Sequence, residues 1–200
     1  PEAGGESRPQ ATDREQKAKI RAEAGKAGLA GDVTAGLSSS RLLLRVVSLP
    51  DAPDDELHSM VQLQVDKFSP FPVETMVVSY EVIGRKDGKS AVLVAAAQEE
   101  VVHAMGATLD SLGLVPDRMD VEVLGWWQLL QDAGQVPAHG RHVALITEAG
   151  LPDLIVFQDG SPILFRSLGE SEGLAGEEFD VETARAVSYT MMSLEMDHGS

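Results

Sequence analysis

Phe68-Ser69-Pro70-Phe71-Pro72 is the stretch of this 200-residue sequence that fixes the order of the elements around it. Upstream, residues 54–68 begin with three acids and then place apolar side chains at helical spacing, which predicts a helix with its acids at the positive end of the dipole. The helix should end at Ser69, because Pro70 disfavours helical geometry in the residue before it. The two prolines should then hold Phe71 in a short extended turn.

Two strands are predicted after that turn and one before the helix. Residues 77–83 alternate apolar and polar side chains, which is typical of a strand with one buried face. Asp87-Gly88 is a strong hairpin-turn signal, and residues 91–97 are apolar throughout, which favours a strand covered on both faces. Because residues 41–49 form another apolar run, the order strand, helix, strand, strand is predicted for residues 41–97.

The flanking segments complete an α/β fold with mixed sheets. We predict a disordered or weakly helical lead over residues 1–32, and a strand at 33–37 that forms a hairpin with 41–49 through Ser38-Ser39-Ser40. The last part of the chain, residues 124–200, is predicted to hold a helix, three strands and a final helix. The further predicted elements are a helix at 99–112, a strand at 119–123, a helix at 124–130, strands at 143–147, 154–158 and 163–168, and a helix at 181–196.

Composition excludes several classes of function. The formal net charge is −16, and a protein that neutralises nucleic-acid phosphates needs a basic stripe, which this sequence lacks. The chain contains no cysteine, so disulfides, thiolate metal sites and a cysteine nucleophile are ruled out. The longest apolar run, 91–97, is far shorter than the ~20 residues that span a bilayer. Since there is no initiator methionine, we expect a piece of a longer protein.

A search for catalytic and metal-binding patterns finds none. His139 and His142 are close in sequence, but an arginine lies between them and no third ligand is near. Gly25-Lys26 lacks the earlier glycine and the following Ser or Thr of a phosphate-binding loop. We therefore predict no catalytic residue and no metal site.

Three aromatic residues are the candidates for partner binding. Phe71 either plugs the gap between the helix and the next strand or stands partly exposed as an anchor in the wall of a groove. Trp126 and Trp127 are adjacent, so both rings cannot face one core. One core ring beside one partly exposed ring is the simpler interpretation, and a partner-binding hot spot is the alternative.

Residues 33–123 resemble the PilM family of type IV pilus assembly proteins and, more distantly, the cytoplasmic part of GspL in type II secretion. The resemblance is carried by the order of short motifs, which are residues 45–50 (RVVSLP), 68–72 (FSPFP), 80–84 (YEVIG), 92–97 (VLVAAA), 112–116 (LGLVP) and 120–122 (DVE). It implies a partial actin-like fold in which the strand-helix-strand-strand unit at 41–97 is an inserted subdomain. It also implies that the chain is truncated at both ends.

The resemblance further implies a phosphate-binding turn after the strand at 143–147. Glu148-Ala149-Gly150 stands where the family tends to have Asp-x-Gly, so Glu148 and Gly150 are the candidate cofactor-binding residues of a degenerate turn. No first phosphate turn precedes residue 33, and the lobe that would hold the adenosine is not in this sequence. We expect no resident cofactor in this chain, with ATP and Mg²⁺ possible in a longer parent.

The function that the resemblance implies is that of a non-enzymatic scaffold, cytoplasmic and peripheral at the bacterial inner membrane. It would dock the tail of an inner-membrane pilus or secretion protein similar to PilN, or an assembly ATPase, in a groove beside the inserted subdomain. The alternative is an actin-like nucleotide-binding ATPase whose remaining lobe is missing, with Glu148 as the one carboxylate in the right place. A generic α/β domain unrelated to pili is the third interpretation.

Overall fold

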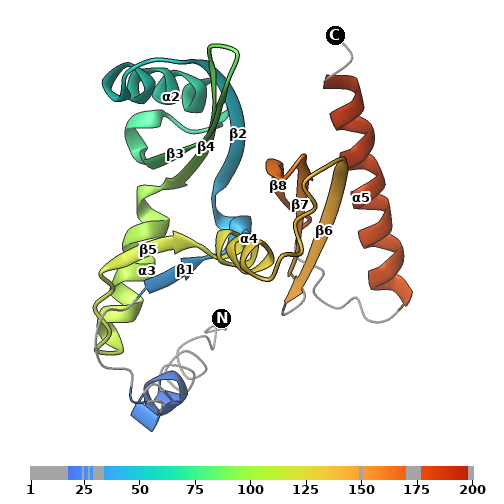
Figure 1. The fold of residues 1–200 in the computed structure, drawn as a ribbon. Helices are drawn as coiled ribbons and strands as arrows, with labels where there is room; N and C mark the ends of the chain where they lie inside the picture. The colour runs from blue at the N-terminus through green and yellow to red at the C-terminus, as the bar shows by residue number, and fades with distance from the viewer. Residues whose placement is uncertain are drawn as a thin grey trace, which may run out of the picture. The chain divides into compact units, whose positions relative to one another are not determined.

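The computed structural model describes residues 18–23, 25–26, 28, 34–148, 151–169 and 177–197. Helices and strands both recur along the chain (Figure 1), which confirms the predicted α/β class. The elements are β1 (Thr34–Leu37), the 3-10 helix η1 (Ser39–Arg41), β2 (Leu43–Pro50), α2 (Asp54–Phe68), the 3-10 helix η2 (Val73–Thr75), β3 (Met76–Lys86), β4 (Lys89–Gln98), α3 (Glu99–Ser111), β5 (Arg118–Val121), α4 (Glu122–Asp132), β6 (Arg141–Glu148), β7 (Leu151–Gln158), β8 (Ser161–Ser167) and α5 (Glu177–Asp197).

The chain divides into two compact units, which are described separately. Unit 1 contains the described residues up to Ala35 together with Glu100–Asp120, and unit 2 contains Gly36–Glu99 and Val121–Ser200. In unit 1, the helical residues 18–23 carry Arg21, whose guanidinium donates hydrogen bonds to the carbonyl oxygens of Ser111 and Leu112 at the end of α3. A cation at this place satisfies carbonyl groups that a helix end leaves without partners.

The predicted strand-helix-strand-strand order is confirmed in unit 2 as β2, α2, β3 and β4. The three strands form one antiparallel sheet in the order β2-β4-β3. Asp87 and Gly88 both have positive φ, 52° and 71°, as the tight turn between β3 and β4 requires. The helix ends at Ser69, whose backbone N–H bonds to the carbonyl of Val65 at 2.8 Å, so the predicted stop before Pro70 is also confirmed.

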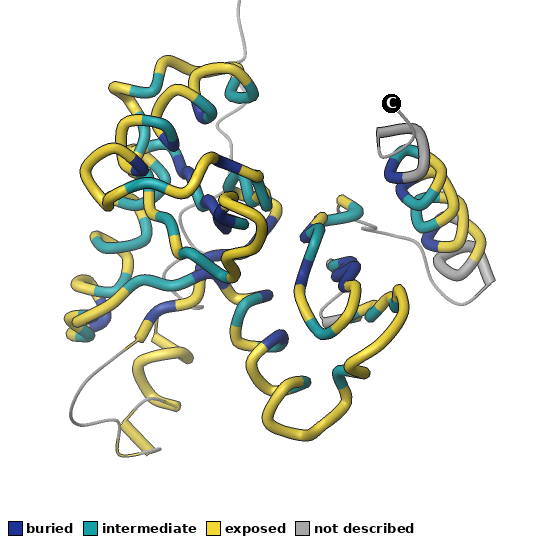
Figure 2. Tube along the Cα trace, turned by 45° about the horizontal axis from the view of Figure 1, so that its top comes forward, coloured by how far each residue is buried: buried dark blue, intermediate teal, exposed yellow. Residues whose placement is uncertain are grey.

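The central strand β4 is buried on both of its faces, as its apolar sequence predicts. On one face, Val92, Val94 and Ala96 pack with buried residues of α2. On the other, Leu93 belongs to a second core cluster that also contains residues of α4, β7 and β8. Figure 2 shows buried positions inside this sheet and exposed positions along the outer side of α2. One strand therefore joins two cores of unit 2.

The second sheet of unit 2 is antiparallel in the order β6-β7-β8, and α5 packs on one of its faces. Asp159-Gly160 forms the predicted turn between β7 and β8. Leu194 of α5 is buried against Leu154 and Val156 of β7, with Val187 and Met191 beside it. Ala184, which the helical stripe also placed inward, is exposed. Within the described residues, no helix combines the length and the apolar character needed to cross a membrane.

The hairpin predicted through Ser38-Ser39-Ser40 is wrong. β1 pairs with β5, and β2 pairs with β4. Ser39, Ser40 and Arg41 form the single 3-10 turn η1, and Ser39 is buried. Three consecutive serines are a turn signal, but the hydroxyl of Ser39 donates a hydrogen bond to the half-buried carboxylate of Asp153 on β7. That contact cannot be read from the local sequence.

Candidate functional site

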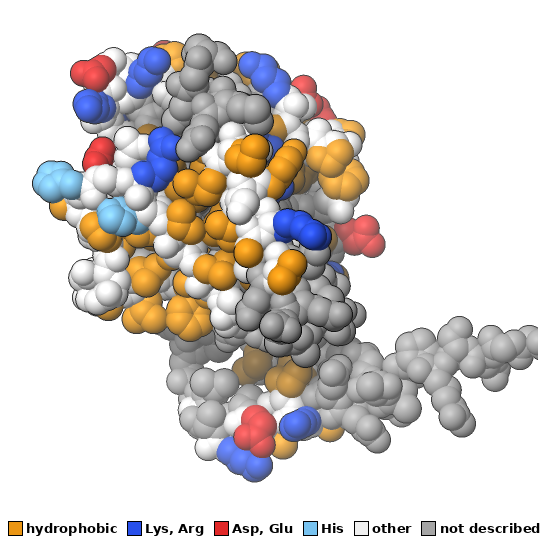
Figure 3. Space-filling model, turned by 90° about the vertical axis from the view of Figure 1, so that its right-hand side faces the viewer, with side chains coloured by type: hydrophobic (Ala, Val, Ile, Leu, Met, Phe, Trp, Pro, Cys, Tyr) orange, Lys and Arg blue, Asp and Glu red, His pale blue; other side chains and the backbone are white. Residues whose placement is uncertain are grey.

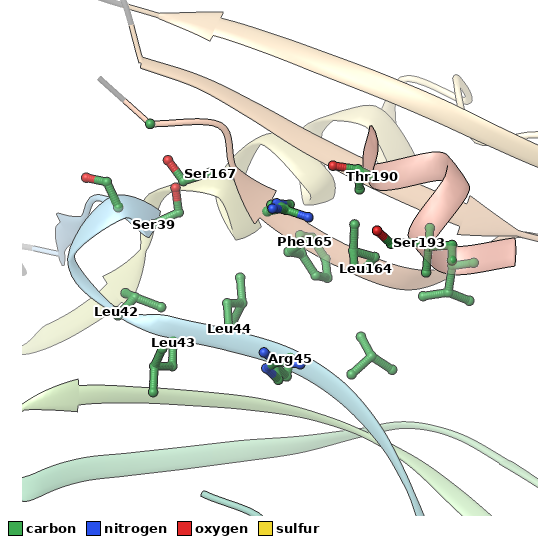
Figure 4. Close-up of a pocket in the computed structure, with 16 residues that line it drawn as sticks. Ser39, Leu42, Leu43, Leu44, Arg45, Leu164, Phe165, Ser167, Thr190 and Ser193 are labelled. Atoms are coloured by element: carbon green, nitrogen blue, oxygen red, sulfur yellow. The ribbon is translucent and has the colours of Figure 1, made fainter. Parts of the chain in front are cut away.

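A cavity of about 580 Å³ lies in unit 2 between β2 and η1 on one side and β8 and α5 on the other. Its volume is within the range of ligand-binding pockets. Figure 4 shows Leu44 of β2 and Leu164 and Phe165 of β8 between the two strands, with Thr190 and Ser193 of α5 at the far side. The cavity thus combines an apolar floor with hydroxyl groups that can hydrogen-bond a ligand.

One end of the cavity is closed by a cluster of polar side chains around Asp153 of β7. The hydroxyl of Ser39 donates a hydrogen bond to Asp153 Oδ1, and Ser167 of β8 is a second partner of the same carboxyl. Burial raises the pKa of the Asp153 carboxyl above its ordinary value of 3.8, and the two serine hydrogen bonds offset part of that rise. The cluster holds η1 against the second sheet, which fixes where β2 begins.

Asp153→Asn is expected to be more stable than the wild type at pH 7. Folding raises the pKa of the Asp153 carboxyl, so the folded protein binds the carboxyl proton more tightly than the unfolded chain does. The ionised carboxylate therefore lowers stability above the folded pKa, and this cost disappears as the pH falls below 3.8, the unfolded value. The advantage of the Asn variant, measured by urea unfolding, should shrink on acidification.

Asp153→Ala is the control, because it removes the charge and also the oxygen that accepts from Ser39. It should be less stable than the Asn variant at every pH. An Asn variant that is less stable than the wild type at pH 7, by a margin that grows with pH, would show that the charge itself stabilises the fold.

Two arginines line the cavity in a protein of strongly negative net charge. Arg45 lies over the ring of Phe68 at 5.1 Å, and Arg166 lies over the ring of Tyr189 at 5.9 Å. Among the described residues, no Asp or Glu lines the cavity. An aromatic ring positions each guanidinium without neutralising it, so this site favours an anionic group on its ligand.

Phe71, a predicted partner-binding residue, lies outside this cavity and is 43% exposed. The interpretation of Phe71 as a core plug is therefore wrong. Its turn is held by Ser69, whose Oγ lies 3.0 Å from the backbone N and 2.8 Å from the carbonyl O of Phe71. The prolines and this serine fix the backbone, so the ring is not needed to fill a gap. Its role as a partner anchor stays a prediction.

Phe71→Ala is expected to change the free energy of unfolding by less than about 1 kcal/mol, because an exposed ring loses little packing on truncation. Thermal or urea unfolding checks this directly. Phe68→Ala, at the partly buried end of the same helix, is the matched comparison and should cost more. A loss of several kcal/mol in Phe71→Ala would restore the core-plug interpretation.

Trp126 and Trp127 take the simpler of the two predicted arrangements. Trp127 is 8% exposed and packs against Phe157 and Phe165 in the second core cluster. Trp126 is half-buried and has interactions of its own. Neither ring lines the cavity. Partner binding by Trp126 remains a prediction, whereas the position of Trp127 is that of a core residue.

Glu148 of the predicted phosphate turn does not line the cavity. Glu148 is the last residue of β6 and stands opposite Leu151 of β7. Gly150 lies outside the described residues. His139 and His142 are joined by a 2.8 Å contact between the ring Nε2 of His142 and the carbonyl O of His139. In the part of the chain that the structure describes, no three potential metal ligands come together.

A separate apolar surface occupies the face of unit 2 that carries α5 and β6 (Figure 3). Val143 and Leu145 of β6 stand opposite Val156 and Leu154 of β7, so they share the face that α5 covers, yet both remain 41% exposed. Val181, Tyr189 and Met192 of α5 are also exposed. Charged and polar groups do not converge here as they do in the cavity, so the cavity is the better candidate site.

Comparisons with known proteins identify one family and several similar solved structures. The model of the family described as "Type IV pilus assembly protein PilM" matches residues 17–166. A chain of the "PilM-PilN type IV pilus biogenesis complex" is 21% identical, with a TM-score of 0.66 over 90% of this chain and 60% of that one. This likeness shows the fold, and the present chain spans 60% of that chain's length.

Two other solved structures are similar at lower scores. The cytoplasmic domain of EpsL, an inner-membrane component of the type II secretion system of Vibrio cholerae, is 16% identical, with a TM-score of 0.49 over 75% of this chain and 56% of that one. A Bacteroides thetaiotaomicron protein with an actin-like ATPase fold and unknown function is 12% identical, with a TM-score of 0.47 over 90% and 62%.

Proposed function

Since the chain belongs to the family of type IV pilus assembly protein PilM, we propose that it is a cytoplasmic scaffold at the bacterial inner membrane that docks the tail of a membrane partner similar to PilN. Membership alone indicates a pilus-assembly role. The complex that shares this fold pairs PilM with PilN. A PilN-like tail is therefore the first partner to test, and an assembly ATPase is the second.

The cavity beside β2 is the observation that carries the docking proposal. β2 is the first strand of the inserted subdomain, and the cavity joins it to β8 and α5. A docking groove needs apolar contacts for affinity and a few polar groups for orientation. Leucines of β2, Phe165 and the hydroxyls of Thr190 and Ser193 supply both. A scaffold needs no catalytic group, so the proposal also includes the absence of enzymatic activity.

A tail-binding titration with two serine variants of α5 tests the proposal. Ser193 lines the cavity, whereas Ser188 of the same helix does not. Both hydroxyls donate to the carbonyl four residues earlier, at 3.0 and 2.8 Å, so the two sites are locally matched. Ser→Trp changes helix propensity little. In Ser193→Trp the indole should fill the cavity and weaken binding of a labelled PilN-like tail peptide by at least about tenfold, or 1.4 kcal/mol.

Ser188→Trp should bind the peptide as the wild type does, and a scrambled peptide should bind neither. The docking proposal fails if the wild type binds no PilN-like tail, and the cavity is the wrong site if both Trp variants bind equally. Adding Mg-ATP to the same titration tests the rival ATPase. Saturable low-micromolar Mg-ATP binding that Glu148→Ala abolishes would contradict the absence of enzymatic activity.

A further inference from the structure

The strand β6 has a pairing partner on one side and a free edge on the other. It lies at the end of the sheet β6-β7-β8, and among the described residues β7 is the one strand that pairs with it. The backbone N–H and C=O groups on the outer side of an edge strand are a template for a further strand. Its register against β7 runs without a shift from Arg141 to Glu148, so β6 is a regular edge without a bulge.

The other edge strands of the two three-stranded sheets carry features that hinder pairing with another chain. Natural edges are protected by bulges, prolines and charged side chains. β3 has an irregular register and ends in Lys86, β8 has an irregular register and contains Pro162, and β2 carries Arg45 and ends in Pro50. By contrast, β6 contains no proline, lysine or bulge, and its residues 143–146 are all apolar. It is therefore the least protected edge of the two sheets.

The two faces of β6 differ in how well they are covered. Ala144 and Ile146 pack against the second core cluster, which contains residues of α4 and β7. Val143 and Leu145 lie on the face that carries α5, yet each is 41% exposed. Among the described residues, the core cluster under α5 contains members from β7, β8 and α5 but none from β6. The helix therefore covers the neighbouring strands and leaves the apolar side chains of β6 open.

The sequence of β6 complements itself when two copies run antiparallel. A twofold axis perpendicular to the sheet keeps each face of the strand on the same side, so Val143 and Leu145 of one copy meet the same two residues of the other. The strand begins with a base, Arg141, and ends with an acid at position 148. Antiparallel pairing brings the basic start of each copy to the acidic end of the other, whereas parallel pairing would bring like charges together.

We propose that β6 is a self-association surface, along which two copies of this chain pair antiparallel and join their β6-β7-β8 sheets into one continuous sheet. The side chains of Val143 and Leu145 that α5 leaves open then bury one another across the twofold axis, and the backbone groups of the two edges form hydrogen bonds. This inference does not depend on where a tail docks, because no residue of β6 lines the cavity.

The net charge of the protein limits the strength of this contact. The formal net charge is −16, so two copies repel each other as they approach. Salt at physiological ionic strength screens that repulsion beyond about 8 Å, and within β6 itself the one acid stands at the last position. A single strand pair also buries less surface than a standard protein–protein interface. The dimer is therefore a weak one that forms at micromolar concentrations of protein.

Sedimentation equilibrium of the 200-residue protein tests the dimer. The wild type should shift from monomer to dimer as its concentration rises. Leu145→Lys places a charge on the apolar side of the edge, and Thr147→Lys places one at an exposed position of the same side without removing an apolar side chain. Each should weaken dimerisation by at least about tenfold. Leu63→Lys, on the outer side of α2 at a residue that is 63% exposed, is the control and should dimerise as the wild type does.

A single-cysteine scan of residues 143–147 tests the antiparallel arrangement, and the natural sequence has no cysteine to interfere. At a twofold axis, one residue of β6 stands opposite its own counterpart with Cα atoms about 4.5–5.5 Å apart, which a disulfide can bridge. A residue two positions away is displaced from its counterpart by four residues of strand, or about 14 Å. Mild oxidation should therefore give a covalent dimer whose yield peaks at one position and falls on either side, and Leu63→Cys should give little.

Three results would overturn the self-association of β6. The first is a wild type that stays monomeric at every concentration. The second is a dimer that both lysine variants form as readily as the wild type, because such a dimer would use another surface. The third is equal crosslinking at all positions of the scan, which random collision or parallel strands would give. Circular dichroism of each variant confirms that it is folded, and Thr147→Lys decides the test if Leu145→Lys is not.

Discussion

Trp127→Ala is expected to lower the free energy of unfolding by about 3–5 kcal/mol, because it removes a large buried ring from a core of unit 2. The ring of Trp127 is 5.4 Å from that of Phe157 and 6.3 Å from that of Phe165, the second pair meeting edge to face at 89°. These three rings lie in the cluster that joins α4 to both sheets. Truncation would leave a cavity at a junction where neither sheet can move in to fill it.

Trp126→Ala is the matched control, because it removes the same side chain one residue earlier from a half-buried position. It should cost distinctly less, about 1 kcal/mol. Unfolding should be followed by circular dichroism, since each variant changes the tryptophan fluorescence. Equal losses for the two variants would show that the burial of Trp127 is not what stabilises the cluster.

Leu57→Ala is expected to cost about 2–5 kcal/mol of unfolding free energy. Leu57 is the first apolar residue of α2, has no exposed surface, and packs with Val61 and Val65 against β4. Its removal would open a void under the first turn of the helix. Leu57 does not line the cavity that we propose as the docking site, so a folded Leu57→Ala protein should still bind the peptide.

Leu63→Ala provides the comparison within the same helix. Leu63 is 63% exposed on the outer side of α2, so its truncation should change stability by no more than about 0.5 kcal/mol. Urea midpoints of the two variants give the difference. If Leu63→Ala were the more damaging, α2 would have to present its other side to β4.

The order strand, helix, strand, strand over residues 41–97 could be predicted from sequence because its signals are local. Pro70 stops α2 by acting on the residue next to it, and Asp87-Gly88 forces a turn by its own φ angles. The unbroken apolar run from 91 to 97 is simply explained by burial on both faces, and β4 is buried on both faces in the structure. Each of these elements is decided within a few residues of chain.

The partner of β1 could not be predicted, because strand pairing is decided at a distance. Thr34–Leu37 is followed within a few residues by the strand Leu43–Pro50, and adjacency favoured a hairpin. Its actual neighbour is β5, Arg118–Val121, which follows only after β2, α2, β3, β4 and α3. Nothing in either short strand identifies the other, and the serines between β1 and β2 gave a misleading turn signal.

The candidate site was missed for the same reason. Arg45, Arg166 and Ser193 come from three separate parts of the chain, and only the fold brings them to one cavity. The aromatic residues Phe71 and Trp126 stood out in the sequence, but neither lies there.

The burial of β4 on both faces should slow the exchange of its backbone amide hydrogens with solvent. Its N–H groups lie between β2 and β3, and its two faces belong to different cores. Exchange at residues 89–98 therefore requires both cores to open together, whereas the edge strands can exchange through smaller local openings. The slowest amides of unit 2 should therefore lie in β4.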